Sequence, residues 1–509
     1  MSVQPSTNIR LLRDIPLDNS YTNTLWFDTT QDQLDYFNIN ANQNGIKLTN
    51  QTYQRVNKNR ARVDINVGKI YDVNYMMFQN TGYSNKWFYA FILSVEYVND
   101  SCTEIEFEID VFQTYMFDFM LGDCYVEREH VIDDSIGANT TTENLEIGEY
   151  CENTKQHFTT GYGVAMYSAT SESDNWGFKN NVFSSLSVIG YDEAGTMQNL
   201  REHISMYNDV PEAIAMITMI SDKMVVGNGR VAGFTDSFNV QRDMNFTFKG
   251  DSYKPKNNKL YCYPYSMFTV DNFNGDTEHY KWEDFNNPFS AEFTRRGTIN
   301  PRPCMEAYPT GYKNYEACEE YGLIYDNFPI CPYVNDTYRA WVSQALPKGI
   351  ASVGSTIITT ALMGGGSLGA MGKALAVGDV VGNITNFAIE NEYHKVHSKS
   401  VVGSPSNSGM NWNSKRIGFR AISFTVKPEF ARIIDEYFTR FGYKVNRVEV
   451  PYMHSRKSFN YIKTASCMIK GAIPASDKDK LMQIFNNGVT LWHDTENVGN
   501  YEVDNSIII

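Results

Sequence analysis

The strongest constraint on the fold is the strict alternation of charged and apolar residues in TEIEFEIDV, residues 103–111. A period of two is typical of a β-strand with one face on the core and one in water. RARVDINV at 60–67 alternates in the same way. KWFYAFILSVEYV at 86–98 is apolar for most of its length, which favours a strand buried on both faces. We therefore expect residues 1–130 to form a β domain.

The acidic face of residues 103–111 has two interpretations. Its side chains are Glu104, Glu106, Glu108 and Asp110. Charged strand faces are usually just hydrated, so the first interpretation is an outer face opposite Arg60 and Arg62. The second is the negative lining of a channel to which DNA does not adhere.

Composition supports a β-rich fold and limits the partners. Aromatic residues make up 14% of the 509 residues, mostly Tyr and Phe, which suit half-buried pleated surfaces. The formal net charge of −15 argues against a protein that grips nucleic acid, but it permits a conduit. The N-terminus has no apolar core of signal-peptide length, and no CxxC pair occurs among the eight cysteines. We expect reduced thiols and synthesis in the cytoplasm.

The middle of the chain, residues 131–340, carries many turn signals and is expected to be β-rich. VVGNGRVAG at 225–233 and NFNGDTE at 272–278 are typical of hairpin connections. Residues 202–222 favour a helix with a break before Pro211.

The last part, residues 411–509, is expected to be α+β. A helix is predicted over 427–442, with Pro428 in its first turn and Gly442 at its end. Its apolar stripe comprises Phe430, Ile433, Ile434, Tyr437 and Phe441. A second helix is predicted over 476–488, with Ser476 as N-cap and Gly488 as stop, followed by a short strand at 489–493.

Residues 341–410 differ from the rest of the chain. No residue from Gly349 to Gly372 is charged, and from Gly349 to Ile389 only Lys373 and Asp379 are, against nine glycines. The stretch is long enough to span a bilayer, as one pass or as a hairpin, and its small-xxx-small spacings suit close helix packing. The alternative is a buried hairpin or a seam between subunits. The predicted membrane-active or plug residues are Ile350, Val353, Ile357, Ile358, Leu362, Met363, Gly364, Gly365, Gly366, Leu368, Met371, Leu375, Val377, Val380, Val381, Ile384, Phe387 and Ile389.

Enzymatic motifs are weak. GGGSLG at 364–369 with Glu390 matches a dinucleotide fingerprint, but the helix that should follow would contain four glycines, and the rest of the chain shows no βαβ alternation. The fragment GKA at 372–374 lacks the Ser or Thr and the first Gly of a phosphate loop. No set of residues stands out for nucleophilic catalysis. We expect neither an enzyme nor a cofactor.

His394 and His397 lie three residues apart in EYHKVH. On a helix both side chains point the same way, yet no further metal ligands cluster near them, so no metal site is predicted. The alternatives are plain solvation and pH sensing at the base of the apolar segment.

Both ends of the chain resemble a known family. NIRLLRDIPLDNSYTNTLWF (8–27), MFQNTGYSNKWFYAFILSVEYVN (77–99), TEIEFEIDVFQTYMFDF (103–119) and VEREH (126–130) are similar to tail-knob, or distal tail tube, proteins of small short-tailed bacteriophages of Gram-positive hosts. RFGYKVNRVEVPYMHSRKSFNYIKT (440–464) and NNGVTLWHDTENVGNY (486–501) resemble the same family. The resemblance is strong over 1–130 and 411–509 and weak over 131–340.

This resemblance implies a mainly β protein with α+β elements, built of tandem tube-type β-barrel domains that assemble as a hexameric cylinder. It implies a tube domain at 1–130, a tube wall at 131–340, a hydrophobic loop at 341–410 and a completing portion at 411–509. In this family the phage genome leaves through the channel of the cylinder, so double-stranded DNA is an implied partner. So are other tail proteins on the collar and connector side, and host membrane lipids through the loop at 341–404. The implied location is the tail tip of the virion.

Two other functions are compatible with the residues. One is a tail-associated cell-wall hydrolase, against which the missing catalytic motif argues. The other is a receptor-binding adsorption protein, which would bind host wall polymer as an isolated chain.

Overall fold

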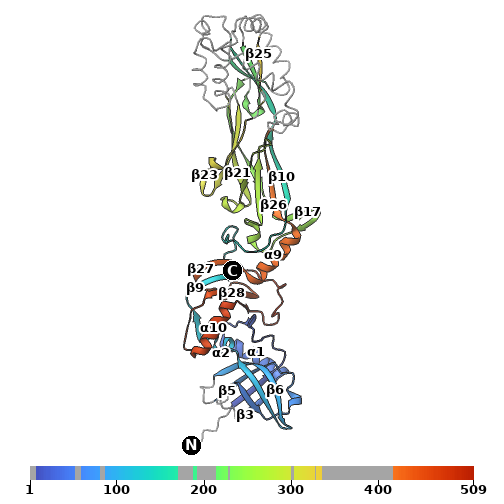
Figure 1. Cartoon of the computed structure of the whole chain (residues 1–509), viewed down its shortest axis with the longest axis vertical. Coiled ribbons are helices and arrows are strands. Elements are labelled where there is room, and N and C mark those ends of the chain that lie inside the picture. Colours follow the sequence, from blue (N-terminus) through green and yellow to red (C-terminus); the bar gives the residue numbers. More distant parts are fainter. Residues whose placement is uncertain are drawn as a thin grey trace, which may run out of the picture. The chain divides into compact units, whose positions relative to one another are not determined.

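The computed structural model describes residues 7–51, 59–80, 86–169, 187–191, 214–226, 230–299, 303–326, 328, 330–334 and 417–508 (Figure 1). The chain forms two compact units, and each combines distant stretches of sequence. Unit 1 comprises 1–147, 255–260 and 429–509, and unit 2 comprises 148–254 and 261–428. The N-terminal and C-terminal portions, which the sequence suggested as separate blocks, therefore share one unit.

Unit 1 contains a six-stranded antiparallel sheet in the order β3-β1-β5-β6-β7-β4. Its strands are β1 (Thr7–Leu12), β3 (Ile46–Gln51), β4 (Arg60–Val63), β5 (Tyr75–Asn80), β6 (Trp87–Asn99) and β7 (Cys102–Ile109). The two edge strands, β3 and β4, approach each other. The amide of Asp64, the residue after β4, donates a hydrogen bond to the side chain of Gln51 in β3 at 3.3 Å. The sheet therefore curves around a core that includes Phe78, Phe88 and Phe107.

Strand β5 is buried on both faces. β6 is buried on both faces only over 88–91, and its second half is exposed, with Leu93 at 51% and Tyr97 at 58%, so the double burial predicted from the apolar run at 86–98 is correct only for the first part of the strand. Phe78 and Phe88 point into the core of the curved sheet, whereas Tyr75 and Tyr89 belong to a second core. Helices pack on that second side (Figure 1). They are α1 (Thr30–Gln43), α2 (Val111–Tyr115) and α10 (Ala475–Asn487).

A second sheet joins the two ends of the chain inside unit 1. Its order is β2-β30-β28-β9-β27, with β2 and β30 parallel and the other pairs antiparallel. The strands are β2 (Asn23–Leu25), β9 (Cys124–Glu129), β27 (Tyr443–Glu449), β28 (Phe459–Ser466) and β30 (Val489–Trp492). β8 (Phe119–Leu121) and β29 (Ile469–Gly471) pair beside it, and α9 (Pro428–Phe441) precedes β27.

Among its described residues, unit 2 contains three larger sheets. The first, β10-β26-β19-β20, consists of β10 (Tyr150–Thr160), β19 (Ser266–Asp271), β20 (Thr277–Tyr280) and β26 (Ile417–Val426). The second, β12-β11-β13-β25, consists of β11 (Tyr162–Ala169), β12 (Ser187–Tyr191), β13 (Ile214–Ser221) and β25 (Ile330–Val334). The third consists of β16 (Phe234–Gln241), β21 (Ser290–Thr298), β22 (Cys304–Tyr312), β23 (Tyr315–Ala317) and β24 (Leu323–Tyr325).

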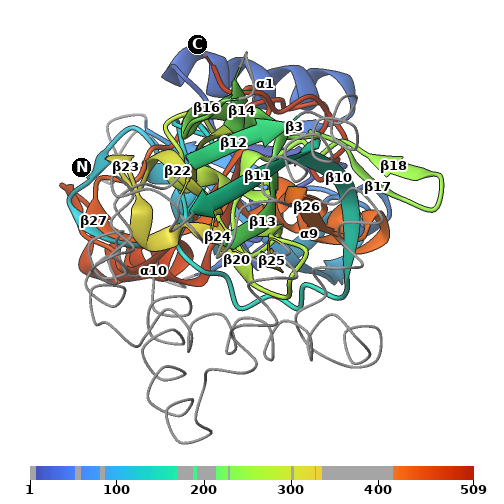
Figure 2. The same ribbon diagram turned by 90° about the horizontal axis from the view of Figure 1, so that it is seen from above.

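Small elements complete the fold. Two hairpins are formed by β14 (Val225–Val226) with β15 (Arg230–Val231), and by β17 (Phe246–Phe248) with β18 (Asp251–Tyr253). The second hairpin projects from unit 2 (Figure 2). The 3₁₀ turns are η1 (Val67–Lys69), η5 (Asp222–Met224), η6 (Asn258–Tyr261), η7 (Trp282–Asp284) and η8 (Glu319–Tyr321).

The core of unit 2 is rich in aromatic rings. The Phe268 ring lies 4.2 Å from that of Trp282, and Phe238 stacks on Phe293 at 5.3 Å between ring centroids. Large aromatic rings bury much apolar area each, so contacts between rings contribute strongly to the core of unit 2. The described part of the chain is therefore mainly β, as expected.

Both predicted hairpins in the middle region are confirmed. β14 pairs with β15 around the connection predicted at 225–233, and β19 pairs with β20 around the one predicted at 272–278. The helix predicted over 202–222 is wrong in its described part, because residues 214–221 form β13. This strand is rich in β-branched residues and pairs with both β11 and β25.

The sequence did not lead us to expect α1, which interrupts the strands of residues 1–130. Its inward face is narrow and consists of Gln33, Phe37 and Ala41. The signal lies at its start, where the Thr29 hydroxyl caps the helix by accepting from the Asp32 amide at 3.1 Å. An S/T-x-x-D/E pattern of this kind marks a helix start.

The two C-terminal helices are confirmed, with corrections. In α9 the buried side is formed by Ala431, Ile434, Asp435 and Phe438, whereas Ile433 of the predicted stripe is 66% exposed. Gly442 ends α9 with φ +59°, and Gly488 ends α10 with φ +94°. Ser476 is not the N-cap of α10, because the helix already begins at Ala475 after Pro474. The strand predicted at 489–493 is present as β30.

Candidate functional site

The acidic residues of β7 face arginines on the neighbouring edge strand β4. Arg62 Nε lies 2.8 Å from Glu104 Oε2, and Arg60 reaches Glu104 Oε1 at 3.2 Å and Glu106 Oε2 at 3.5 Å. Hydrogen bonding from Arg62 lowers the pKa of Glu104. The expected opposition to Arg60 and Arg62 is thus present, with Arg60 opposite Glu106 and Arg62 opposite Glu104 in the ladder.

Glu108 and Asp110 have different surroundings from the first two acids. Glu108 accepts from Lys480 Nζ at 2.9 Å, and although burial favours its neutral form, this bond helps to lower its pKa. Asp110 is fully buried and caps α2, accepting from the Gln113 amide at 3.0 Å and the Tyr75 hydroxyl at 2.8 Å. Burial raises the pKa of Asp110 to about 6. Asp110 is an interior helix cap and cannot line a surface, which corrects its place among the predicted channel residues.

The motif VEREH at 126–130 occupies β9 and the residue after it, between β28 and β27. Each of its charged residues has a partner. Glu127 bonds Lys463 at 3.0 Å, Arg128 bonds Glu143, and Glu129 bonds Arg447 at 3.3 Å. The motif therefore connects the N-terminal and C-terminal stretches of unit 1.

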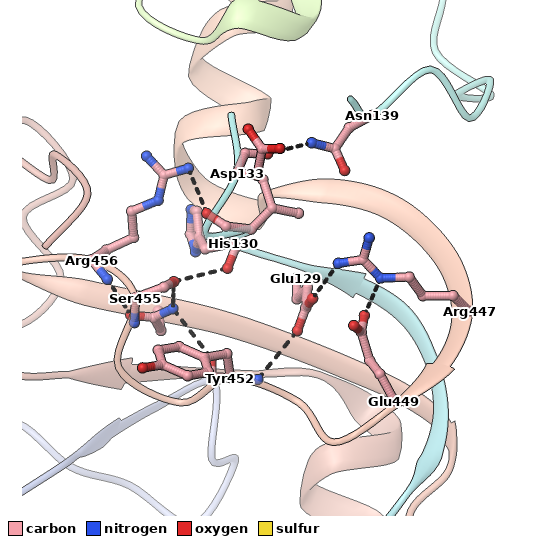
Figure 3. Close-up of polar contacts among 11 residues, drawn as sticks. Glu129, His130, Asp133, Asn139, Arg447, Glu449, Tyr452, Ser455 and Arg456 are labelled. Carbon is pink, nitrogen blue, oxygen red and sulfur yellow. Dashed lines mark hydrogen bonds and ion pairs between the residues drawn. The ribbon is translucent and has the colours of Figure 1, made fainter. Parts of the chain in front are cut away.

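Glu129 belongs to a carboxyl pair. Arg447 bonds both Glu129 and Glu449, and the Tyr452 amide donates to Glu129 Oε2 at 3.4 Å (Figure 3). Burial, followed by the charge of Glu449, raises the pKa of Glu129 to about 7. One arginine serves two carboxyl groups here, so the site holds a proton more firmly than an exposed glutamate does.

His130 is buried and neutral. Its Nδ1 accepts from the Tyr461 amide at 2.7 Å, so its Nε2 carries the proton and donates to the Thr439 carbonyl at 3.0 Å. Burial, with the charge of Arg456, lowers the pKa of His130 to about 3. Ser455 and Arg456 donate to the carbonyls of His130 and Val131 (Figure 3). This histidine holds the chain in place and is not poised for proton transfer near neutral pH.

A buried ionic cluster lies on the other face of β9. The Glu143 side chain is 2% exposed and accepts from Arg128, from Lys259 Nζ at 2.6 Å and from the Lys444 amide at 2.8 Å. Asp435 accepts from the amides of Lys256 and Asn257 at 2.7 and 3.0 Å. Residues 255–260, which leave unit 2 in sequence, are therefore held in unit 1.

Sequence reasoning did not identify Glu129, His130 or Glu143. The available signal was the run EREH, which places charged residues at consecutive positions of a strand, so that some of them must be buried and paired. In the described residues, no group of three or more His, Cys, Asp or Glu side chains is arranged to hold a metal ion.

The predicted hydrophobic segment at 341–410 lies outside the described residues. It contains the eighteen predicted membrane-active or plug residues and also His394 and His397. The residues on either side of it are described. Val334 ends β25 and pairs with Ile214, whereas Ile417 begins β26 and pairs with Thr160. The segment therefore leaves unit 2 from one sheet and returns to another. Among the helices that the structure describes, none is long and apolar enough to cross a membrane.

Two family models match the chain. Residues 231–506 match the C-terminal domain of Bacillus phage phi29 tail knob protein gp9, and residues 5–120 match the N-terminus of caudoviral major tail proteins. The first match covers more than half of the chain.

Relatives match along nearly the whole length. The tail knob protein gp9 of Bacillus phage phi29 is 28% identical over 597 aligned positions, covering 98% of both chains. The gp9 proteins of Bacillus phages PZA and B103 are 28% and 24% identical, also with 98% coverage of both chains. The alignments are longer than this chain, so they contain gaps in it.

The fold also matches a solved structure. The tail knob protein gp12 of bacteriophage C1 superimposes with a TM-score of 0.63 over 99% of this chain and 100% of the other, at 14% identity. That likeness concerns the fold alone. With the family models and the full-length relatives, the chain belongs to the tail-knob protein family of short-tailed bacteriophages, the structural components of the phage tail.

Proposed function

We propose that the chain forms the distal tube of a short phage tail, as a hexameric cylinder through which the double-stranded genome leaves. The observation that supports this most is the family match, which runs through both ends of the chain and most of the residues between. In this proposal the other tail proteins on the collar and connector side are neighbours, and the protein acts without catalysis.

The lining of the proposed channel includes Glu104, Glu106 and Glu108. The arginines of β4 neutralise part of their charge, so this face has a patterned rather than a uniformly negative surface. Such a face offers DNA no continuous cationic track, and the counterion release that drives tight DNA binding is then absent.

The hydrophobic segment at 341–410 is proposed to plug the tube and then to penetrate the host membrane. Its support is the uncharged run from Gly349 to Gly372 in a chain with net charge −15. Apolar area that leaves a wet lumen for lipid is stabilised by about 25 cal/mol per Å². The glycines permit the change of backbone conformation that such a transfer needs.

Dye release from liposomes tests the membrane role. In the test variant, residues 349–389 are replaced by a Gly/Ser linker of equal length, since Val334 and Ile417 lie on different sheets and a short bridge would strain unit 2. The matched control replaces the polar stretch 391–403 in the same way. We expect release by the parent and the control, at neutral or mildly acidic pH, and none by the test variant.

Equal release by all three proteins would remove the membrane role from this segment. In phage particles the same test variant is expected to adsorb normally and to fail in infection. Loss of adsorption would instead favour a receptor-binding protein, and wall-degrading activity of the isolated chain would favour a hydrolase.

A further inference from the structure

Four large apolar side chains of unit 1 face solvent on neighbouring strands. Val448 of β27 is 71% exposed, Tyr125 of β9 38%, Met120 of β8 70%, and Met468, just before β29, 52%. We call these four residues the outer apolar row. Single exposed apolar residues are ordinary, whereas a contiguous set marks an interaction surface.

The strand register makes the row contiguous. Val448 is the direct ladder partner of Tyr125, and Tyr125 is also paired with Ser466, two residues before Met468. The Gly122 amide donates a hydrogen bond to the Met468 carbonyl at 2.8 Å. The Met468 side chain lies close by, since a Cβ placed on Gly122 would be 3.3 Å from Met468 Sδ. Because Lys470 is opposite Met120, Met120 and Met468 share the outward face of the β8–β29 pair.

Val448 lies on the edge strand of its sheet and faces Tyr125 of β9, whereas Met120 and Met468 lie on or next to the separate β8–β29 pair. In the part of the chain that the structure describes, β27 is the last strand of the order β2-β30-β28-β9-β27, and its one ladder partner is β9. An edge strand with exposed apolar side chains invites pairing or packing with another chain. The exposure continues past β27, since Val450 is 51% exposed.

Charge around the row favours a second copy of this chain as the occupant. The chain carries −15 net charge, so two copies repel each other over most of their surfaces. Around the row both signs are present. Asp123 and Lys470 are exposed, and Glu127 is paired with Lys463 at 3.0 Å. A surface with an apolar centre and mixed charges at its border is one that a like-charged copy can approach.

We propose that the outer apolar row is a contact surface between adjacent copies of this chain in the tail. This inference rests on the proposed assembly of the chain into a ring and adds which surface the copies use. The side chains of Met120 and Val448 are about 70% exposed, so charged residues can be introduced there while the core of the unit is kept.

The test is the mass of the assembled full-length protein, measured by native mass spectrometry and analytical ultracentrifugation across a concentration series. The variant is Met120→Glu with Val448→Glu. The control is Ile39→Glu with Ile433→Glu, which changes residues 52% and 66% exposed in the same unit. We expect the apparent association constant of the row variant to fall by about tenfold or more, since each contact would then have to bury two carboxylates in place of apolar side chains. The control should assemble as the parent does, and circular dichroism should be unchanged in both.

Assembly of the row variant at the parent's strength would overturn the surface and leave the ring proposal intact. A parent that stays monomeric at every concentration would overturn the ring proposal, and the surface with it. A photo-crosslinking amino acid in place of Tyr125 tests the occupant in whole phage particles. A cross-linked dimer of this chain is expected, whereas cross-links solely to another tail protein or to lipid would contradict the proposal.

Discussion

Strands β7 and β9 both carry several charged residues, but they use them differently. On β7 the charges alternate with core residues and have exposed partners on β4, such as Arg62, which is 70% exposed. On β9 the charges are consecutive, so Glu129 and Arg128 are only 4% and 10% exposed. One face of β7 is partly open to water beside the edge strand β4, whereas β9, which lies between β28 and β27, must satisfy its charges inside the protein. Charge density alone therefore does not identify a functional surface.

The largest expected effect is that of Glu143→Ala on the β9 side of the comparison. The change leaves Arg128 and Lys259 buried without their carboxylate, and breaking a buried ion pair costs about 3–5 kcal/mol of folding free energy. Chemical denaturation of the full chain measures this loss. An unchanged unfolding midpoint would mean that water reaches these cations.

Gly442→Ala should be nearly as damaging, because Gly442 meets the backbone of β9. Its φ is +59°, and a Cβ there would lie 2.1 Å from the Glu129 carbonyl oxygen. We expect a loss of about 3 kcal/mol from the strained backbone and the clash. Gly250→Ala is the control. It also has positive φ but nothing within 4 Å, so it should cost only about 1 kcal/mol, again by denaturation.

Glu129→Gln is expected to change how stability depends on pH. The pKa of Glu129 is about 7 in the folded state against 4.5 for an ordinary glutamate. Folding therefore takes up a proton between these values, and Glu129 destabilises the parent increasingly as pH rises from 4.5 to 7. The glutamine variant lacks this penalty and should be more stable than the parent by about 2 kcal/mol at pH about 8, with the gain vanishing toward pH about 4.5.

The neighbouring His130 has the opposite dependence. With a folded pKa of about 3 against the usual 6.5, it destabilises the fold as pH falls below 6.5. The effects of Glu129 and His130 on the parent's free energy of unfolding therefore partly cancel as pH changes. The quantity to measure is the difference in the free energy of unfolding between parent and Glu129→Gln at each pH. A difference that does not depend on pH would contradict a raised pKa at Glu129.

The smallest effect is expected on β7. Arg62→Ala removes an exposed partner of Glu104, which keeps its bond to Arg60 at 3.2 Å. Exposed ion pairs contribute little and are screened by salt, so the unfolding midpoint should stay at the parent's value. A clear loss of stability at low salt would show that β7 is more like β9 than the exposures indicate.

Much of the fold was predictable where one local pattern dominated. The alternation at 103–111 and the apolar run at 86–98 predicted β7 and β6, and Gly442 and Gly488 correctly marked helix ends. Prediction failed where pairing overrode local preference. Residues 214–221 form a strand because β11 and β25 flank them, and α1 was missed because three inward residues make a weak stripe.

By itself, the sequence determined which residues alternate across strands, where glycine must end a helix, and that one long stretch at 349–389 is apolar and rich in glycine. The tertiary structure alone decided which charges are buried. Glu129 and Glu143 meet partners more than a hundred residues away, and Asp110 leaves the acidic face to cap a helix in the core. The local sequence pattern predicts which face of a helix or strand a residue occupies. The partner of a buried charge comes from a distant segment that packs against it, and the local pattern does not contain that information.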